Sequence, residues 1–131
     1  MVSFSTLLQN FQAQLSTLEL IVSQAHPDAL SLKQHFLVAQ QQFQSEILGE
    51  MAGIEDDLSE RAQPILIEMN RTLRLMGMDV AFLQAARQPL TMQQRQKQLR
   101  DRILQLQTFC QGLLNLNNLS EANPLEPDVG S

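Results

Sequence analysis

Apolar side chains recur along this chain at alternating steps of three and four residues, which is the spacing of one face of an α-helix. The pattern occupies four segments separated by turn-forming residues. Their apolar stripes are Phe4, Leu8, Phe11, Leu15, Leu18 and Val22; Leu32, Phe36, Ala39, Phe43, Ile47 and Met51; Met69, Leu73, Met76, Val80 and Leu83; and Leu99, Ile103, Leu106, Cys110 and Leu113. The sequence therefore predicts an all-α protein, an antiparallel helical bundle of four helical segments.

Proline and short polar residues place the ends of the first two helices. The first begins at Ser3 or Ser5 and ends before Pro27, because proline donates no backbone hydrogen bond and disfavours helix in the residue before it. Asp28 or Ser31 can cap the second helix, since either side chain can accept a hydrogen bond from a free backbone N–H of the first turn.

The third helix is expected to end at Pro89, and Thr91 is the expected cap of the fourth, which should end at Asn117. Residues 1–117 then form the helical bundle domain. Residues 118–131 contain two prolines, several acidic side chains and no apolar periodicity, so they are predicted to be an acidic, disordered tail.

The stretch between the second and third stripes allows two architectures. A loop after Gly53 would let Asp57 cap a separate helix with Pro64 just beyond its first turn, and would give an up-and-down bundle in one chain. Alternatively, the middle two segments are fused into one long kinked helix over residues 29–88, roughly 90 Å long at 1.5 Å per residue. Such a helix would be longer than the helices beside it, and a second chain, in a homodimer, would be needed to bury the part of its apolar face that they leave uncovered.

The third segment is the one around which the rest is organised. Leu75, Phe82 and Ala86 form a second apolar strip beside the first, interrupted only by Thr72 and Asp79. A helix with two apolar strips has either two sets of neighbours within the chain or one set and a partner. The residues that we single out as candidates for contact with a partner are Arg71, Arg74, Leu75, Gly77, Asp79, Phe82 and Arg87.

Asp79 and Gly77 are the unusual residues of this strip. A carboxylate among apolar residues is costly unless it is paired, so Asp79 should meet Arg100 or Arg102 of the last helix, and a structural ion pair is the favoured interpretation over a partner contact. Glycine costs about 1 kcal/mol in a helix interior relative to alanine. We therefore expect another helix, or a partner, to approach closely at Gly77.

Charge is distributed unevenly along the chain. Of the net −5, residues 1–62 contribute −6, residues 63–117 contribute +4 and the tail contributes −3. This asymmetry indicates that the halves face each other, within one chain or between two, or that the basic half meets an acidic partner. No signal peptide or long apolar run is present, and the single cysteine cannot form an internal disulfide, so a cytoplasmic protein without a membrane anchor is expected.

The sequence contains no catalytic, cofactor-binding or metal motif. His26 and His35 do not have a metal-ligand spacing, and the inward position of Cys110 is typical of a small apolar core residue rather than a nucleophile. Nucleic-acid binding is disfavoured because the basic charge is modest and aromatic residues for base stacking are few. A non-enzymatic protein without a cofactor is the expected class.

One block of residues is similar to a known family. Leu73-Arg74-Leu75-Met76-Gly77-Met78-Asp79, followed by Phe82-Leu83-Gln84-Ala85-Ala86-Arg87-Gln88-Pro89, by Gln94-Arg95 and by Asp101-Arg102, resembles the signature block of the cyanobacterial PatD family of heterocyst frequency control proteins. The resemblance covers roughly residues 66–113.

This resemblance implies a small cytoplasmic regulator of cyanobacteria that binds the tubulin-like division protein FtsZ through protein–protein interaction. It would modulate FtsZ polymerisation and so link regulation of cell division to heterocyst differentiation. Two other classes are the alternatives to this function: a DNA-linked developmental regulator and a purely structural helical dimerisation module.

Overall fold

A computed structural model describes residues 3–53 and 56–122, and every regular element in these ranges is helical. The elements are α1 (Phe4–Val22), α2 (Ala29–Gln41), the π-helical segment η1 (Gln42–Ile47), α3 (Leu48–Ala52), α4 (Asp56–Ala85) and α5 (Pro89–Ala122). Because α2, η1 and α3 follow one another without a break, the described chain forms four rods. The prediction of an all-α fold is confirmed.

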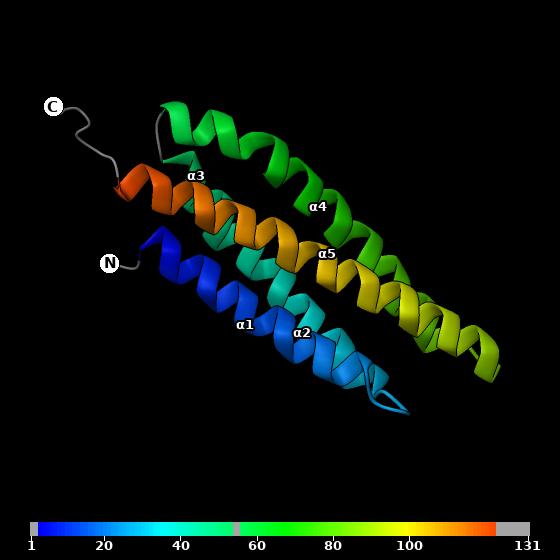
Figure 1. The fold of residues 1–131 in the computed structure, drawn as a ribbon. Coiled ribbons are helices and arrows are strands. Elements are labelled where there is room, and N and C mark those ends of the chain that lie inside the picture. Colours follow the sequence, from blue (N-terminus) through cyan, green and yellow to red (C-terminus); the bar gives the residue numbers. More distant parts are fainter. Residues whose placement is uncertain (1–2, 54–55, 123–131) are drawn as a thin grey trace, which may run out of the picture.

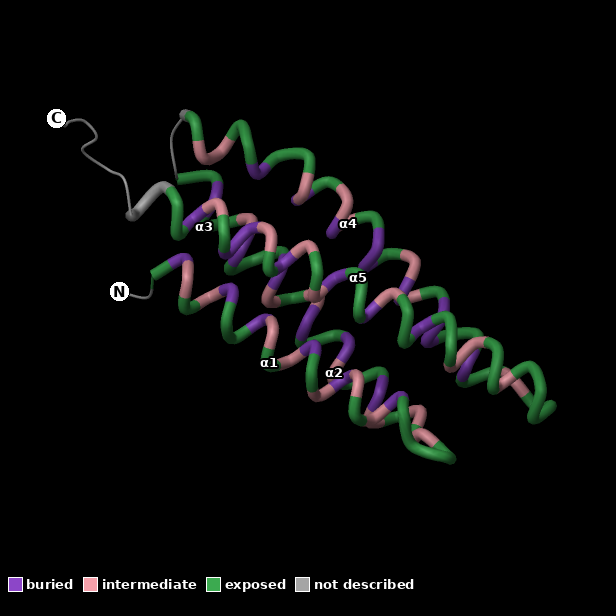
Figure 2. Tube along the Cα trace, in the orientation of Figure 1, coloured by how far each residue is buried: buried purple, intermediate pink, exposed green. Residues whose placement is uncertain are grey.

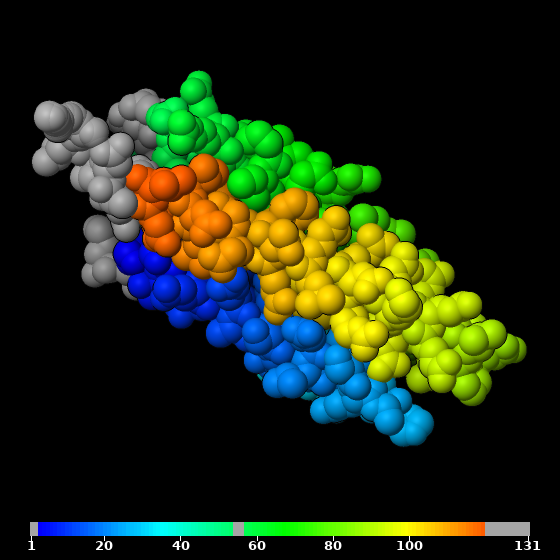
Figure 3. Space-filling view, in the orientation of Figure 1, coloured from blue at the N-terminus to red at the C-terminus, as the bar shows by residue number. Residues whose placement is uncertain are grey.

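The four rods form two antiparallel hairpins that lie side by side (Figure 1). One hairpin consists of α1 and the rod from α2 to α3, and the other consists of α4 and α5. α5 packs on both α1 and α4, while α2 packs on α1 and α4. In the space-filling view, α5 lies between α1 and α4 on the face shown (Figure 3). The chain is therefore an up-and-down bundle, as the first of the two predicted architectures requires.

The alternative of one long fused helix is wrong. α3 ends at Ala52, where the N–H of Gly53 donates to the carbonyl of Glu50 at 3.0 Å, and α4 begins at Asp56 and returns alongside α2 (Figure 1). Pro64 lies more than two turns inside α4 rather than just beyond its first turn. Pro64 is exposed, so water can donate to the backbone carbonyl group that would otherwise accept from an N–H at position 64.

The predicted apolar stripes form the core. Every residue of the four stripes is buried, and Figure 2 shows that the buried positions of each rod face the other rods. Phe11 of α1 and Phe43 of η1 are both fully buried, with ring centroids 6.1 Å apart and planes tilted by 41°. One chain thus buries all four stripes without a partner.

The predicted helix caps of α1 and α2 are present, but the predicted cap of α5 is not. Ser3 and Asp28 cap α1 and α2 by accepting from backbone N–H groups, each at 3.1 Å. Thr91, in contrast, is not a cap. α5 begins two residues earlier, at Pro89, because proline is tolerated at the first helical position, and the N–H of Met92 donates to the carbonyl of Gln88 at 3.0 Å.

The last helix is longer than predicted. α5 continues past Asn117 to Ala122, so the first residues of the predicted disordered tail are helical. Asn117 is itself buried, and Leu113 and Leu114 on the preceding turn are buried as well. Packing therefore carries the helix beyond the asparagines, although their residue type alone indicates a helix end. The rest of the predicted tail, residues 123–131, lies outside the described residues.

Candidate partner-binding surface

α4 presents three faces to its surroundings. Its core face carries the third apolar stripe, and a second face, with the buried Thr72 and Asp79, is turned toward α5. The third face points away from the bundle. Four of the seven candidate residues for partner contact are exposed, namely Arg71, Arg74, Phe82 and Arg87, while Leu75 is half-buried at the border of the second and third faces.

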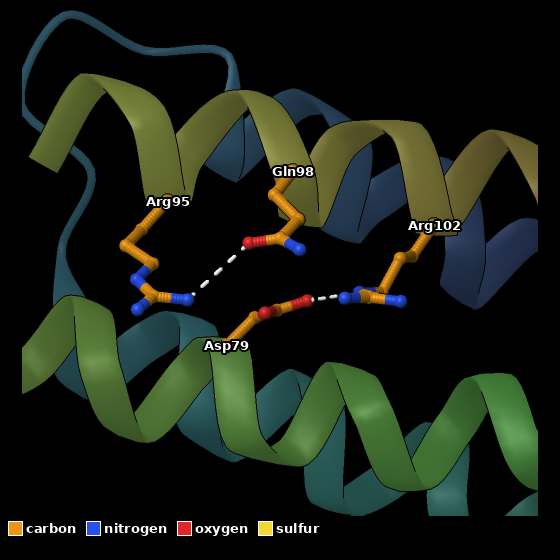
Figure 4. Close-up of polar contacts among 4 residues, drawn as sticks. All are labelled: Asp79, Arg95, Gln98 and Arg102. Atoms are coloured by element: carbon orange, nitrogen blue, oxygen red, sulfur yellow. Dashed lines mark hydrogen bonds and ion pairs between the residues drawn. The ribbon is translucent and has the colours of Figure 1, made fainter. Parts of the chain in front are cut away.

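Asp79 is the polar centre of the contact between α4 and α5. Figure 4 shows Arg95, Gln98 and Arg102 extending from α5 toward it. Nε of Arg102 donates to Oδ2 of Asp79 at 2.5 Å, and the side chains of Arg102 and Asp79 are 20% and 3% exposed. The predicted structural ion pair is confirmed, and Arg102 is the partner rather than Arg100.

Burial raises the pKa of the Asp79 carboxyl above its ordinary value of 3.8, and Arg102 and Arg95 offset this shift only in part. Arg102 lowers the pKa through its hydrogen bond and its charge, and Arg95 lowers it through its charge. A carboxyl whose folded-state pKa is raised contributes most to stability when it is protonated, and that contribution is lost as the pH rises through the folded-state pKa. At neutral pH the buried Asp79 carboxylate therefore depends on Arg102 for its stabilisation.

Arg95 of α5 contacts the ring of Phe82. The guanidinium carbon of Arg95 lies 4.2 Å from the centre of the Phe82 ring, within the range of a cation–π contact. Nη1 of Arg95 also donates to Oε1 of Gln98 at 3.3 Å. The ring remains 44% exposed. One face of Phe82 is thus covered by the chain itself, and the rest is open to contact from outside.

Gly77 lies where α2 approaches α4. A Cβ atom at this position would come within 3.2 Å of Cζ of Phe36, which is closer than nine in ten real Cβ contacts. The predicted close approach of another helix at Gly77 is confirmed. Beside it, Leu37 and Lys33 border a shallow groove of about 220 Å³ between α2 and α4, whose floor is formed by Phe36, Gly77 and Val80.

The space at two glycines predicts different responses to alanine. Gly49, in α3, has no atom within 4 Å of the position that a Cβ atom would occupy, so Gly49→Ala should stabilise the protein by about 0.8 kcal/mol through helix propensity alone. At Gly77 the same gain is opposed by the contact with Phe36, and we expect Gly77→Ala to yield at least about 0.5 kcal/mol less. Urea unfolding of both variants measures this difference, and equal gains would show that α2 does not approach Gly77 so closely.

Charge is separated along the long axis of the bundle. We call residues 13–40 and 71–105, which contain the α1–α2 and α4–α5 turns, the basic end, and residues 3–12, 41–53, 57–70 and 106–119, which contain α3 and the start of α4, the acidic end (Figure 1). Among side chains that the structure describes, the basic end has eight basic against four acidic residues, and the acidic end has one basic against five acidic residues. The charge asymmetry seen in the sequence therefore becomes an end-to-end polarity of the molecule.

Cys110 and His35 both contact α1. Burial raises the pKa of the Cys110 thiol to about 12, and its Sγ donates to the carbonyl of Leu8 at 3.5 Å, so the sulfur is a protonated core atom. Nδ1 of His35 lies 2.9 Å from Nε2 of Gln14 on α1. Across residues 3–53 and 56–122, no group of three or more His, Cys, Asp or Glu side chains gathers as a metal site would.

Two contacts at this surface were not predicted from the sequence. Arg95 over Phe82 is one, and the other involves Gln96, whose Nε2 donates to the carbonyls of Val22 and Gln24 at 2.6 and 2.7 Å and so closes the end of α1. In each contact a half-buried polar side chain of α5 meets a residue far from it in the sequence, either the Phe82 ring or a backbone carbonyl at the end of α1. Apolar spacing carries no signal for such pairs, because it reports which way a residue faces and not what it meets.

The described residues form a single helical bundle in which the Asp79–Arg102 pair joins α4 to α5. The chain belongs to the family described as the CRR41 C-terminal domain, whose profile matches residues 9–109. No curated protein and no solved structure matches it. None of the described helices is long and apolar enough to cross a lipid bilayer.

Proposed function

We propose that this protein is a non-enzymatic, cytoplasmic regulator that binds the division protein FtsZ, modulates its polymerisation and thereby influences heterocyst frequency. The proposal rests on the resemblance of residues 73–102 to the PatD signature block. The family name of the CRR41 C-terminal domain adds no partner or reaction of its own.

The observation that carries the proposal is the place of the block in the fold. Its residues form the second half of α4, the α4–α5 turn and the beginning of α5, which together belong to the basic end. The Asp79–Arg102 pair and the Arg95–Phe82 contact fix these two helices to each other, and Met78, Phe82 and Arg87 stay exposed beside them. Exposed apolar residues with an exposed cation nearby in the chain are a suitable contact for an acidic protein surface.

Polymer pelleting tests this function. FtsZ is polymerised with and without the protein at a one-to-one ratio, and the expected result is a changed pelleted fraction together with co-pelleting of the regulator. An unchanged FtsZ fraction at stoichiometric amounts, with the regulator left in the supernatant, would remove the proposal.

Arg87→Glu and Arg61→Glu form a matched pair of variants for the same assay. Both change an exposed arginine to glutamate, but Arg87 lies at the basic end and Arg61 at the acidic end. We expect Arg87→Glu to weaken co-pelleting several-fold, because it reverses a charge of the candidate surface, and Arg61→Glu to leave co-pelleting at the level of the unaltered protein. Equal losses in both variants would place the contact elsewhere.

A further inference from the structure

The outward face of α4 carries a regular row of exposed residues that the core does not use. We call this row the outer seam. Its members follow alternating steps of three and four residues along the whole helix, and all of them are exposed: Asp57, Glu60, Pro64, Ile67, Arg71, Arg74, Met78, Ala81 and Ala85. Figure 2 shows exposed segments recurring on the side of α4 that is turned away from α5. This is the spacing by which one helix lies along another in a coiled coil.

The order of side chains in the outer seam is self-complementary. Two acidic residues, Asp57 and Glu60, come first, Pro64 and Ile67 follow, and two basic residues, Arg71 and Arg74, come next. Ile67 is 56% exposed at the centre of this row. A surface that is acidic at one end, apolar in the middle and basic at the other end matches itself when it is turned by a twofold rotation.

The spacing permits this match residue by residue. From Asp57 to Arg74 the steps are three, four, three, four and three, a series that reads the same in both directions. In an antiparallel pair of α4 helices, Asp57 therefore faces Arg74, Glu60 faces Arg71 and Pro64 faces Ile67. Twofold symmetry repeats each contact, which gives four ion pairs around an apolar centre. A parallel pair in register would instead place like charges opposite each other, which is destabilising.

We propose that a second copy of this chain covers the outer seam, with the two α4 helices antiparallel and centred between Pro64 and Ile67. Existing contacts do not oppose this arrangement. Asp57 pairs with Arg61 at 3.6 Å and Arg71 pairs with Glu68 at 3.4 Å, but both pairs are exposed ones within a helix turn and are weak. Among the described residues, neither Glu60 nor Arg74 forms an ion pair.

The size of the seam sets the strength of the dimer. Six residues from each chain meet over about 26 Å, at 1.5 Å per residue. Such a contact falls in the small class of specific interfaces, below about 1,200 Å² in total, and four of the six residues are charged and close to solvent. The dimer should therefore be weak, should form as concentration rises and should be weakened by salt.

Sedimentation velocity of the full chain over a range of concentrations at low salt tests the proposal. The expected result is a rise in mass from 14.8 kDa toward twice that value, reversed by added salt. Glu60→Arg and Arg71→Glu, each alone, should weaken the dimer at least about tenfold, because each places like charges opposite each other twice. The combined variant Glu60→Arg/Arg71→Glu should restore it, since the pair is then inverted.

Arg100→Glu is the matched control, because Arg100 is an exposed arginine of α5 outside the outer seam. It should leave the dimer unchanged. A single mass of 14.8 kDa at every concentration would overturn the proposal, and so would a dimer that the single variants do not weaken or that the combined variant does not restore. FtsZ is absent from this experiment, so its outcome is separate from that of the proposed function.

Discussion

Replacing Arg102 with methionine should lower the free energy of unfolding by about 3 kcal/mol at pH 7. The substitution keeps most of the volume of the side chain but leaves the Asp79 carboxylate, 3% exposed, without its hydrogen-bonded counter-ion. Removing one partner of a buried pair costs roughly 3–5 kcal/mol, and the charge of Arg95 nearby places this case at the lower end.

The loss in Arg102→Met should shrink as the pH falls. Without Arg102, the pKa of Asp79 is free of the two strongest influences that lower it, so burial raises the pKa further. The folded protein then takes up a proton more readily than the unfolded chain, whose Asp79 carboxyl has the ordinary pKa of 3.8. Stability of the variant relative to the unaltered protein is therefore recovered toward about pH 4 and lost again as the pH rises through the folded-state pKa. Urea unfolding at several pH values measures this trend.

Lys97→Met is the matched control for Arg102→Met. Lys97 also lies on α5 and pairs with Asp101 at 3.1 Å, but both side chains are more than half exposed, so its removal should change stability by no more than about 0.5 kcal/mol. For the same reason Asp79→Leu should change stability more than Asp101→Leu. A loss of stability in Arg102→Met that does not depend on pH, or that is no larger than the loss in Lys97→Met, would show that the Asp79 carboxylate is not buried between α4 and α5.

Replacing Phe43 with alanine should destabilise the bundle by about 4 kcal/mol, the largest effect that we expect of a single substitution. Phe43 is fully buried on η1 and packs against Phe11 of α1, so alanine removes buried apolar surface and leaves a cavity between the helices. Chemical unfolding followed by circular dichroism gives the loss.

Phe82→Ala is the control for this substitution, because it removes the same atoms from a ring that is 44% exposed. It should cost about 1 kcal/mol, which is the cation–π contact with Arg95 and a part of the ring's burial. A smaller loss at Phe43 than at Phe82 would show that the core of the bundle does not lie where α1 meets η1.

The apolar stripes are predictable because they depend only on the geometry of a helix. Each stripe residue from Phe4 to Leu113 is buried, and burial of one face is what the three-four spacing encodes. The ion pair of Asp79 is predictable for a similar reason, since a carboxylate in an apolar strip must be paired, although spacing alone allows both Arg100 and Arg102 as partners.

The break between α3 and α4 is not decided by local sequence. Both a loop and a continuous helix suit the sequence around Gly53, and the packing of α2 and α3 against α4 favours two separate helices. The C-terminal end of α5 shows the same effect, because the buried Asn117 lies within the helix. Tertiary contacts override end signals that are worth about 1 kcal/mol each.

The outer seam escapes sequence analysis for a different reason. Its three-four spacing is as regular as that of the core, but it consists of mixed charged, small and apolar residues, and a search for apolar periodicity ignores such a row. Only the structure shows that Ile67 and Met78 lie on the same exposed face as Arg71 and Arg74. The partner-binding roles of the four exposed candidates, Arg71, Arg74, Phe82 and Arg87, stay predictions.

If FtsZ binds the basic end and the outer seam joins two copies, the two basic ends of the dimer point in opposite directions. This follows from the antiparallel arrangement of the α4 helices, which places each α4–α5 turn at a separate end of the assembly. One dimer would then carry two contact sites for FtsZ, and a concentration-dependent dimer would make its effect on polymers depend steeply on its own abundance.

Hydrogen–deuterium exchange of the protein with and without FtsZ tests the central claim most directly, because it reports which part of the bundle meets the partner. The claim is that FtsZ contacts the basic end, where the resemblant block joins α4 to α5. We therefore expect slower exchange over residues 78–90 when FtsZ is added, and unchanged exchange over α3 and the first turns of α4. Slower exchange confined to the acidic end, or no change anywhere at saturating FtsZ, would contradict it.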